Sequence, residues 1–259
     1  MYKINTIILD WAGTTIDYGS FAPVNALIAA FDKVGIKAGM EETRAPMGMA
    51  KRDHVKKMLE SENIAKQWQV KYGRSHTDAD VDEIYAHFEP ALFAVLKNHA
   101  EPLPGVLDTV AKIRQMGIAI GSTTGYTRAM MDVVAPLAKE KGYAPDCLVC
   151  PEETGNKGRP YPFMLWHNLE ILGTESINNV LKIGDTLADI EEAKNAGCLS
   201  VGVLKGSSLL GLSEEEVSEI NGFKFSLFME RTRNKYMEAG ADFVIEAIDE
   251  LPELIKSLK

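Results

Sequence analysis

The stretch IILDWAGTT, residues 7–15, decides the fold. Its short apolar run is β-branched, which predicts a buried strand of a parallel sheet. The run ends at Asp10, and a turn rich in glycine and threonine follows. Backbone N–H groups in such a turn can bind phosphate oxygens, although a lone aspartate there is also ordinary turn chemistry. Asp10 is therefore a candidate functional residue whose companions must be found elsewhere in the chain.

The chain after residue 103 alternates strand-like and helix-like patterns. Apolar runs that each precede a polar or glycine-containing loop occur at residues 118–120, 148–149, 180–183 and 201–203. Helical patterns lie between most of them, and such alternation predicts βαβ units joined into a parallel sheet. The expected fold class is α/β, with a Rossmann-like parallel sheet as its core.

Residues 19–100 have a different pattern. Apolar residues recur at helical spacing from residue 21, Pro23 is suited to a helix start, and residues 41–99 contain no convincing strand. Pro90 interrupts one apolar stripe, where we expect a kink or a break. We predict an all-helical cap domain at residues 19–100, inserted into an α/β core domain formed by residues 1–18 and 101–259.

The composition is that of a globular protein able to bury a sizeable core. Of 259 residues, 46% are hydrophobic and 25% charged. The formal net charge of −9 provides no overall attraction for nucleic acid or an anionic membrane, so neither partner is expected. No apolar run approaches the roughly 20 residues of a membrane span, and the N-terminus lacks an apolar signal core. Three cysteines make no disulfide framework, which favours a cytoplasmic location.

Polar residues after the predicted strands should meet at one edge of the sheet, where ligands of such folds bind. Three carboxylates among them form a hard oxygen site suited to Mg²⁺, and hydroxyls with a guanidinium can hold a phosphate-like group. A nucleophilic carboxylate, a metal and anion binders together suit phosphoryl transfer through an aspartyl-phosphate. The residues are Asp10, Asp185 and Asp189 for the carboxylates, and Ser122, Thr123, Thr124 and Arg159 for the anion.

These residues resemble the four ordered motifs of the haloacid dehalogenase superfamily, and the resemblance spans nearly the whole chain. Two positions depart from the superfamily's phosphatases. Those enzymes carry a second aspartate two residues after the nucleophile, where this sequence has Ala12, and a lysine in the third motif, where it has Arg159.

The segments PMGMAKRDH (46–54), GSTTGYTR (121–128) and GRPYP (158–162) are similar to the phosphonatase family of that superfamily, which cleaves the C–P bond of phosphonoacetaldehyde. The resemblance implies that Lys51 forms a Schiff base with the aldehyde and that Asp10 is the nucleophile. It implies that Mg²⁺ is held by Asp10, the carbonyl of Ala12 and Asp185, with Asp189 as a further candidate. It also implies a homodimer joined through cap helices, for which residues 21–34 are an amphipathic candidate.

The chemistry of such a cleavage supports this assignment. A bare carbanion is a very poor leaving group, whereas an imine lets the carbon depart as an enamine. No leaving oxygen then needs a proton, so Ala12 is tolerable. The amine must be partly neutral near pH 7, and burial or nearby positive charge would lower its pKa from about 10.4. His54, three residues beyond Lys51, is a candidate proton shuttle or a simple polar contact.

Two further residues have equally open roles. Tyr126 either contacts the substrate or packs, and Met47 either lines the pocket or fills the core. Two other functions also stay open: a phosphatase or dehalogenase of the same superfamily, against which Ala12 argues, and a non-catalytic phosphate- or partner-binding module. The presence of both Asp10 and Asp185 argues against such a non-catalytic module.

Overall fold

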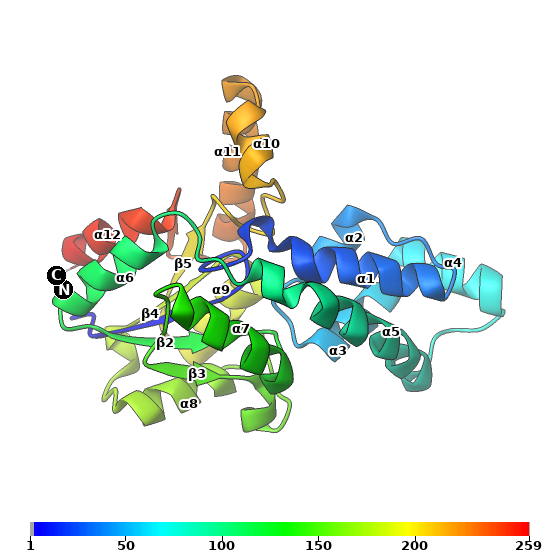
Figure 1. The fold of residues 1–259 in the computed structure, drawn as a ribbon, viewed down its shortest axis with the longest axis horizontal. Helices are drawn as coiled ribbons and strands as arrows, with labels where there is room; N and C mark the ends of the chain where they lie inside the picture. Colours follow the sequence, from blue (N-terminus) through cyan, green and yellow to red (C-terminus); the bar gives the residue numbers. More distant parts are fainter. Residues whose placement is uncertain (1–2, 259) are drawn as a thin grey trace.

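The computed structural model describes residues 3–258 and confirms the α/β fold class. Six strands form one sheet in the order β3-β2-β1-β4-β5-β6, and every neighbouring pair is parallel (Figure 1). The strands are β1 (Thr6–Leu9), β2 (Ala119–Thr123), β3 (Cys147–Val149), β4 (Val180–Gly184), β5 (Leu199–Val203) and β6 (Phe243–Ile245). The central β1 places the residue that follows it in the middle of the sheet edge.

Helices cover both faces of the sheet, and the alternation of side chains along β1 follows this arrangement. Ile8 packs with residues of α8 (Phe163–Leu172) and α9 (Leu187–Ala196) on one face. Ile7 and Leu9 belong to the larger apolar cluster of the other face, which α6 (Val106–Gln115), α7 (Arg128–Glu140) and α12 (Leu251–Ser257) complete. Burial on both faces explains why these strands are continuous apolar runs.

Five of the six α-helices between β1 and β2 in the sequence extend to one side of the sheet (Figure 1). They are α1 (Phe21–Lys33), α2 (Met40–Arg44), α3 (Lys51–Leu59), α4 (Glu62–Tyr72) and α5 (Asp78–Leu96). The longest, α5, packs against both α1 and α3. The fold thus includes the expected helical insertion, here called the cap, while its limits at residues 19 and 100 stay a prediction.

Two features of the cap bear on other expectations. α5 continues through Pro90, so the helix has no break at the proline. Phe88 and Leu92 on either side of Pro90 are buried, and their packing holds the helix together there. The apolar face of α1, including Leu27 and Phe31, is buried within the same chain. A dimer built on residues 21–34 would therefore need another face of this helix, and the homodimer stays a prediction.

Polar contacts hold the cap against the sheet domain. Ile16 and Pro102, on the two segments that join the parts, form an isolated antiparallel bridge. Arg44 of α2 donates hydrogen bonds to the carbonyls of Gly19 and Ser208, at 2.7 and 2.8 Å. Arg44 thus links the cap to the sheet domain through its hydrogen bond to the Ser208 carbonyl.

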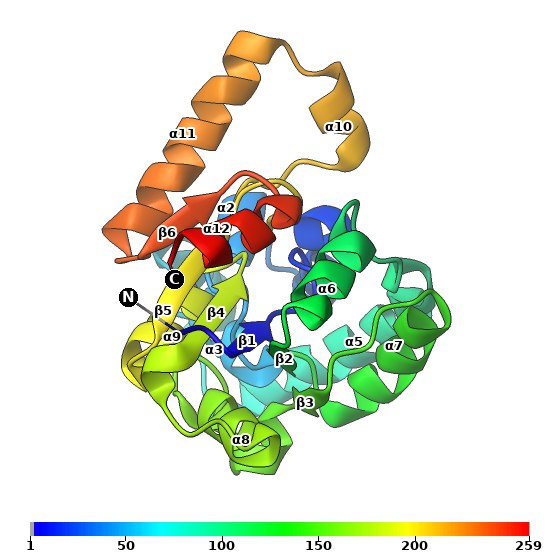
Figure 2. The same cartoon turned by 90° about the vertical axis from the view of Figure 1, so that its left-hand side faces the viewer.

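The C-terminal third contains an element that the sequence patterns did not predict. Helices α10 (Glu214–Glu219) and α11 (Gly222–Glu238) form a hairpin that projects from the sheet domain (Figure 2). A capping box begins α10, with the Ser213 side chain accepting from the Glu216 N–H. Among residues 3–258, no helix combines the length and the apolar character needed to span a bilayer.

Candidate active site

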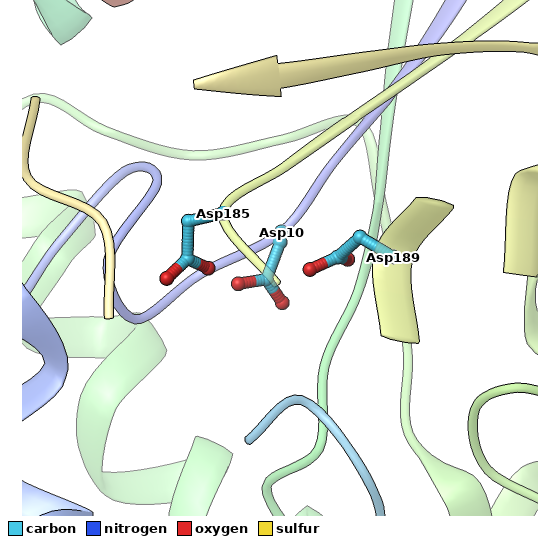
Figure 3. Close-up of side chains that lie close together, drawn as sticks. All are labelled: Asp10, Asp185 and Asp189. Atoms are coloured by element: carbon cyan, nitrogen blue, oxygen red, sulfur yellow. The ribbon is translucent and has the colours of Figure 1, made fainter. Parts of the chain in front are cut away.

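Three buried aspartates meet beyond the carboxyl ends of β1 and β4 (Figure 3). Asp10 follows β1 directly, and its N–H bonds to the Ile183 carbonyl of β4 at 3.0 Å. Asp185 follows β4, and Asp189 lies in the first turn of α9. One carboxylate oxygen from each lies within 4.8 Å of the others. The edge of the sheet thus brings together the carboxylates that the sequence predicted.

Arg159 lies against Asp10 and is fully buried. Its Nη2 donates to the Asp10 Oδ1 at 2.6 Å, and its Nη1 pairs with the Asp189 Oδ1 at 3.1 Å. Burial alone would lower the pKa of Arg159, but Asp10, Asp189 and Glu192 raise it. The guanidinium therefore stays charged beside the proposed nucleophile.

Two buried charges behind Arg159 were not found by sequence reasoning. Glu192 of α9 accepts from the Arg159 Nε at 3.1 Å, and the Lys182 Nζ of β4 lies 2.8 Å from the Asp189 Oδ1. A signal was available for each: Lys182 interrupts the apolar run of β4, and Glu192 is three residues beyond Asp189 on one helix.

The charge balance and the geometry fit a divalent cation. The buried carboxylates Asp10, Asp185, Asp189 and Glu192 outnumber the buried cations Arg159, Lys182 and Lys51 by one charge. Burial, followed by repulsion from Asp10 and Asp189, raises the pKa of Asp185 well above its usual range. A bound Mg²⁺ would relieve this repulsion.

The candidate ligands differ in their freedom to bind a metal. A Cβ on Gly13, whose φ is +90°, would collide with the Asp185 Oδ2. The glycine therefore allows the backbone of the turn to lie close to that carboxylate. Asp189 is already committed to Thr186, Arg159 and Lys182. Burial alone would raise the pKa of Asp189, but Arg159 and Lys182 lower it. Asp10 and Asp185 fit as the protein's metal carboxylates, and Ala12 lines a small cavity beside Asp10.

The three hydroxyl residues at the end of β2 have different positions. Thr124 lines the cavity beside Asp10 and accepts a hydrogen bond from the Tyr126 N–H at 3.1 Å. The Ser122 Oγ accepts from the Trp11 Nε1 and donates to the Cys147 carbonyl, so it is used inside the sheet. The Thr123 Oγ1 bonds to Lys182 and Glu192. Of the three, Thr124 is the one brought to the cavity.

Lys51 reaches the same cavity from the cap, where it begins α3. It is buried, and within residues 3–258 its Nζ forms no hydrogen bond or ion pair; it lies 5.1 Å from the ring centre of Tyr126. Burial lowers the pKa of Lys51 to about 8, with Arg159 acting in the same direction and Asp10 opposing it. An unpaired amine of this kind is a nucleophile near neutral pH.

His54 lies one turn further along α3. Its Nε2 is 2.8 Å from the Thr43 carbonyl, so this nitrogen carries the proton, and no described residue pairs with its buried Nδ1. Burial and the charge of Lys51 lower the pKa of His54 to about 3. The ring is neutral at pH 7 and presents an acceptor on Nδ1.

The cavity is small. Its volume is about 20 Å³, room for about one water molecule. Residues of both the cap and the sheet domain line it, including Met47, Lys51, Tyr126 and the previously unassigned Ser20 and Thr186. Met47 also lines a cleft of about 960 Å³ between α2, α3, α4 and the start of α9. The cavity between the cap and the sheet domain therefore has no room for an organic substrate in this arrangement.

Comparisons with known proteins agree with this geometry. A family model described as haloacid dehalogenase-like hydrolase matches residues 4–197. The phosphonoacetaldehyde hydrolase of Bacillus cereus (strain AH820) is 46% identical over 257 residues, which are 99% of this chain and 97% of that protein. A bifunctional phosphonoacetaldehyde hydrolase/aminoethylphosphonate transaminase of Clostridioides difficile (strain 630) is 48% identical over 98% of this chain, which spans only 40% of that protein.

A solved structure is also close in fold. The crystal structure of a phosphonoacetaldehyde hydrolase-like protein from Oleispira antarctica has a TM-score of 0.95 and 32% identity, covering 99% of this chain and 92% of the other. The matches in sequence and fold extend over the sheet and the cap alike. The chain therefore belongs to the haloacid dehalogenase-like hydrolases and, within them, to the family of the phosphonoacetaldehyde hydrolases.

Proposed function

We propose that this protein hydrolyses the C–P bond of phosphonoacetaldehyde to acetaldehyde and orthophosphate, with Mg²⁺ as cofactor. The observation that carries the proposal is the buried amine of Lys51, which has no ion-pair partner among residues 3–258 and lies in one cavity with Asp10 and Arg159. The names of the relatives point to the same substrate. A phosphatase of the superfamily has no use for such an amine, because its leaving oxygen needs only a proton.

The reaction begins at Lys51. With a pKa of about 8, about a tenth of the amine is neutral at pH 7. The neutral amine attacks the aldehyde carbon, and loss of one water gives a protonated imine. The Nδ1 of His54, an acceptor near the start of the same helix, can hold the amine or that water by a hydrogen bond. Since the pKa of His54 is about 3, we assign it no cationic role.

The second step occurs at Asp10. Its carboxylate attacks phosphorus, and the electron pair of the C–P bond moves onto the carbon to give an enamine on Lys51 and an aspartyl-phosphate. Arg159 and Thr124 bind the phosphoryl oxygens, which reduces the repulsion between two anions. Asp10, Asp185 and the Ala12 carbonyl would hold Mg²⁺, which would supply further positive charge there.

Two hydrolyses complete the cycle. One water cleaves the aspartyl-phosphate, releasing orthophosphate and restoring Asp10. The enamine takes up a proton to become an imine, and a second water releases acetaldehyde from Lys51. Because imine formation had expelled one water, the net reaction consumes one. Because the cavity has room for only about one water molecule, the cap opens to admit substrate and to release products, and its closure keeps bulk water from the enamine.

The test combines product analysis with matched variants. The native protein with Mg²⁺ should release acetaldehyde and phosphate in equal amounts from phosphonoacetaldehyde. Lys51→Arg keeps the charge but cannot form the imine, so it should be inactive. Lys57→Arg, on the exposed side of the same helix, is the control and should retain activity. Native turnover in the Lys51→Arg protein would contradict the proposal.

A further inference from the structure

Behind the cavity lie two buried charges that the proposed reaction does not use. Lys182 and Glu192 have side chains that are at most 1% exposed, and neither lines the cavity. Burying an ion pair costs several kcal/mol per ion before the charges attract each other. Apolar residues would suit the contact between β4 and α9 better, so the pair calls for an explanation beyond packing.

Glu192 fixes one nitrogen of the Arg159 guanidinium. The three nitrogens of that group are held by three different carboxylates: Nε by Glu192 at 3.1 Å, Nη1 by Asp189 at 3.1 Å and Nη2 by Asp10 at 2.6 Å. Because the guanidinium is planar and rigid, contacts on all three nitrogens determine its orientation. Of the three carboxylates, Glu192 is the one outside the predicted metal site.

Lys182 completes this arrangement. Its Nζ lies 2.8 Å from the Asp189 Oδ1, 2.9 Å from the Thr123 Oγ1 and 3.4 Å from the Glu192 Oε2. Thr123 also donates to the Glu192 Oε2 at 3.0 Å and accepts from the Arg159 Nη2 at 2.9 Å. Lys182 therefore places one positive charge against Asp189 and Glu192, two of the three carboxylates that hold Arg159. Thr123 bonds to Lys182, Glu192 and Arg159 alike.

We propose that Lys182 and Glu192 are positioning residues that orient Arg159 toward Asp10 and so determine how tightly the site binds a phosphoryl group. This inference rests on the proposed function for the identity of the substrate. It adds that affinity for the phosphoryl group depends on charges that never touch it. Thr123, predicted as a phosphate ligand, acts here through Arg159 instead.

The test is a double-mutant cycle, which separates action through Arg159 from a general effect on folding. Glu192→Gln removes the charge with little change in shape. Arg159→Lys removes the nitrogen that Glu192 holds. Orthophosphate binding is measured by calorimetry in the presence of Mg²⁺, and KM and kcat are measured with phosphonoacetaldehyde. Glu191→Gln, the exposed neighbour on α9, is the control.

The expected result is a loss that depends on the arginine. Glu192→Gln should weaken orthophosphate binding and raise KM by about tenfold in the native background, and by less than about twofold in the Arg159→Lys background. An equal loss in both backgrounds, or a lowered Tm with binding unchanged, would show a structural role and overturn the inference. Orthophosphate binding decides this even if phosphonoacetaldehyde proves not to be the substrate. A native protein that does not bind orthophosphate would also overturn it.

Discussion

Replacement of Lys51 by methionine should stabilise the protein at neutral pH. Burial lowers the pKa of this amine from 10.5 to about 8, and each pKa unit is worth about 1.4 kcal/mol. The protonated amine in the folded protein therefore costs about 3 kcal/mol relative to a solvated lysine. Methionine of similar length fills the same space without a charge. Lys51 thus lowers the stability of the folded protein at neutral pH although it belongs to the active site.

The pH dependence of this effect has a definite sign. Below about pH 8 both folded and unfolded states bind the proton, so the gain from Lys51→Met is complete, about 3 kcal/mol. Between about 8 and 10.5 the folded state has lost a proton that the unfolded state keeps, so the native protein becomes more stable as pH rises. The advantage of the variant should therefore disappear by about pH 10.5.

Urea unfolding of both proteins from pH 7 to 10 measures this difference. Lys57→Met is the control, because Lys57 is exposed in the same helix and its ion pair with Glu60 lies at the surface. That variant should differ from the native protein by less than about 1 kcal/mol at every pH. A Lys51→Met protein less stable than native at pH 7, or a difference that does not change with pH, would refute the reasoning.

Three further predictions concern the reaction and the metal. Asp10→Asn should abolish phosphate release yet still form the imine on Lys51; loss of the imine would place Asp10 in the first step. Gly13→Ala, whose Cβ collides with the Asp185 carboxylate, should weaken Mg²⁺ binding more than tenfold by titration calorimetry, and unaltered affinity would count against that ligand. Treatment with EDTA should lower Tm, which Mg²⁺ should restore, since a ligand at 100 times its Kd adds about 2.7 kcal/mol; an unchanged Tm would argue against the metal site.

Much of the fold could be predicted from the sequence because local patterns and tertiary packing agree. Each of the five expected strands is a short buried run in the parallel sheet. β6 and α11 were missed for physical reasons. β6 has three residues, of which only Ile245 is fully buried, so its pattern is weak. α11 projects from the body (Figure 2) and has three buried residues in 17, so its sequence lacks a continuous apolar stripe.

The sequence predicted the residues that meet at the sheet edge better than the buried charges that pack behind Arg159. Asp10, Arg159 and Asp185 follow strands, and topology alone brings them together. Which hydroxyl faces the cavity depends on the direction of the side chain at each position of β2 and of the turn after it. Ser122 was predicted to bind the anion, but its hydroxyl accepts a hydrogen bond from Trp11 inside the sheet. Lys182 and Glu192 were missed because the sequence marks each as a charge on its own element but gives no sign that the strand residue and the helix residue pair. The docking of Lys51 over Asp10 depends on how the cap packs, which motif spacing does not encode.

The measurement that tests the central claim most directly is borohydride trapping with phosphonoacetaldehyde, followed by peptide mass mapping. Borohydride reduces an imine to a stable amine, so the modified lysine can be identified. The account predicts a substrate-dependent adduct on Lys51 and none on half-buried Lys56 or exposed Lys57 of the same helix. Phosphate release without any adduct on Lys51 would contradict it.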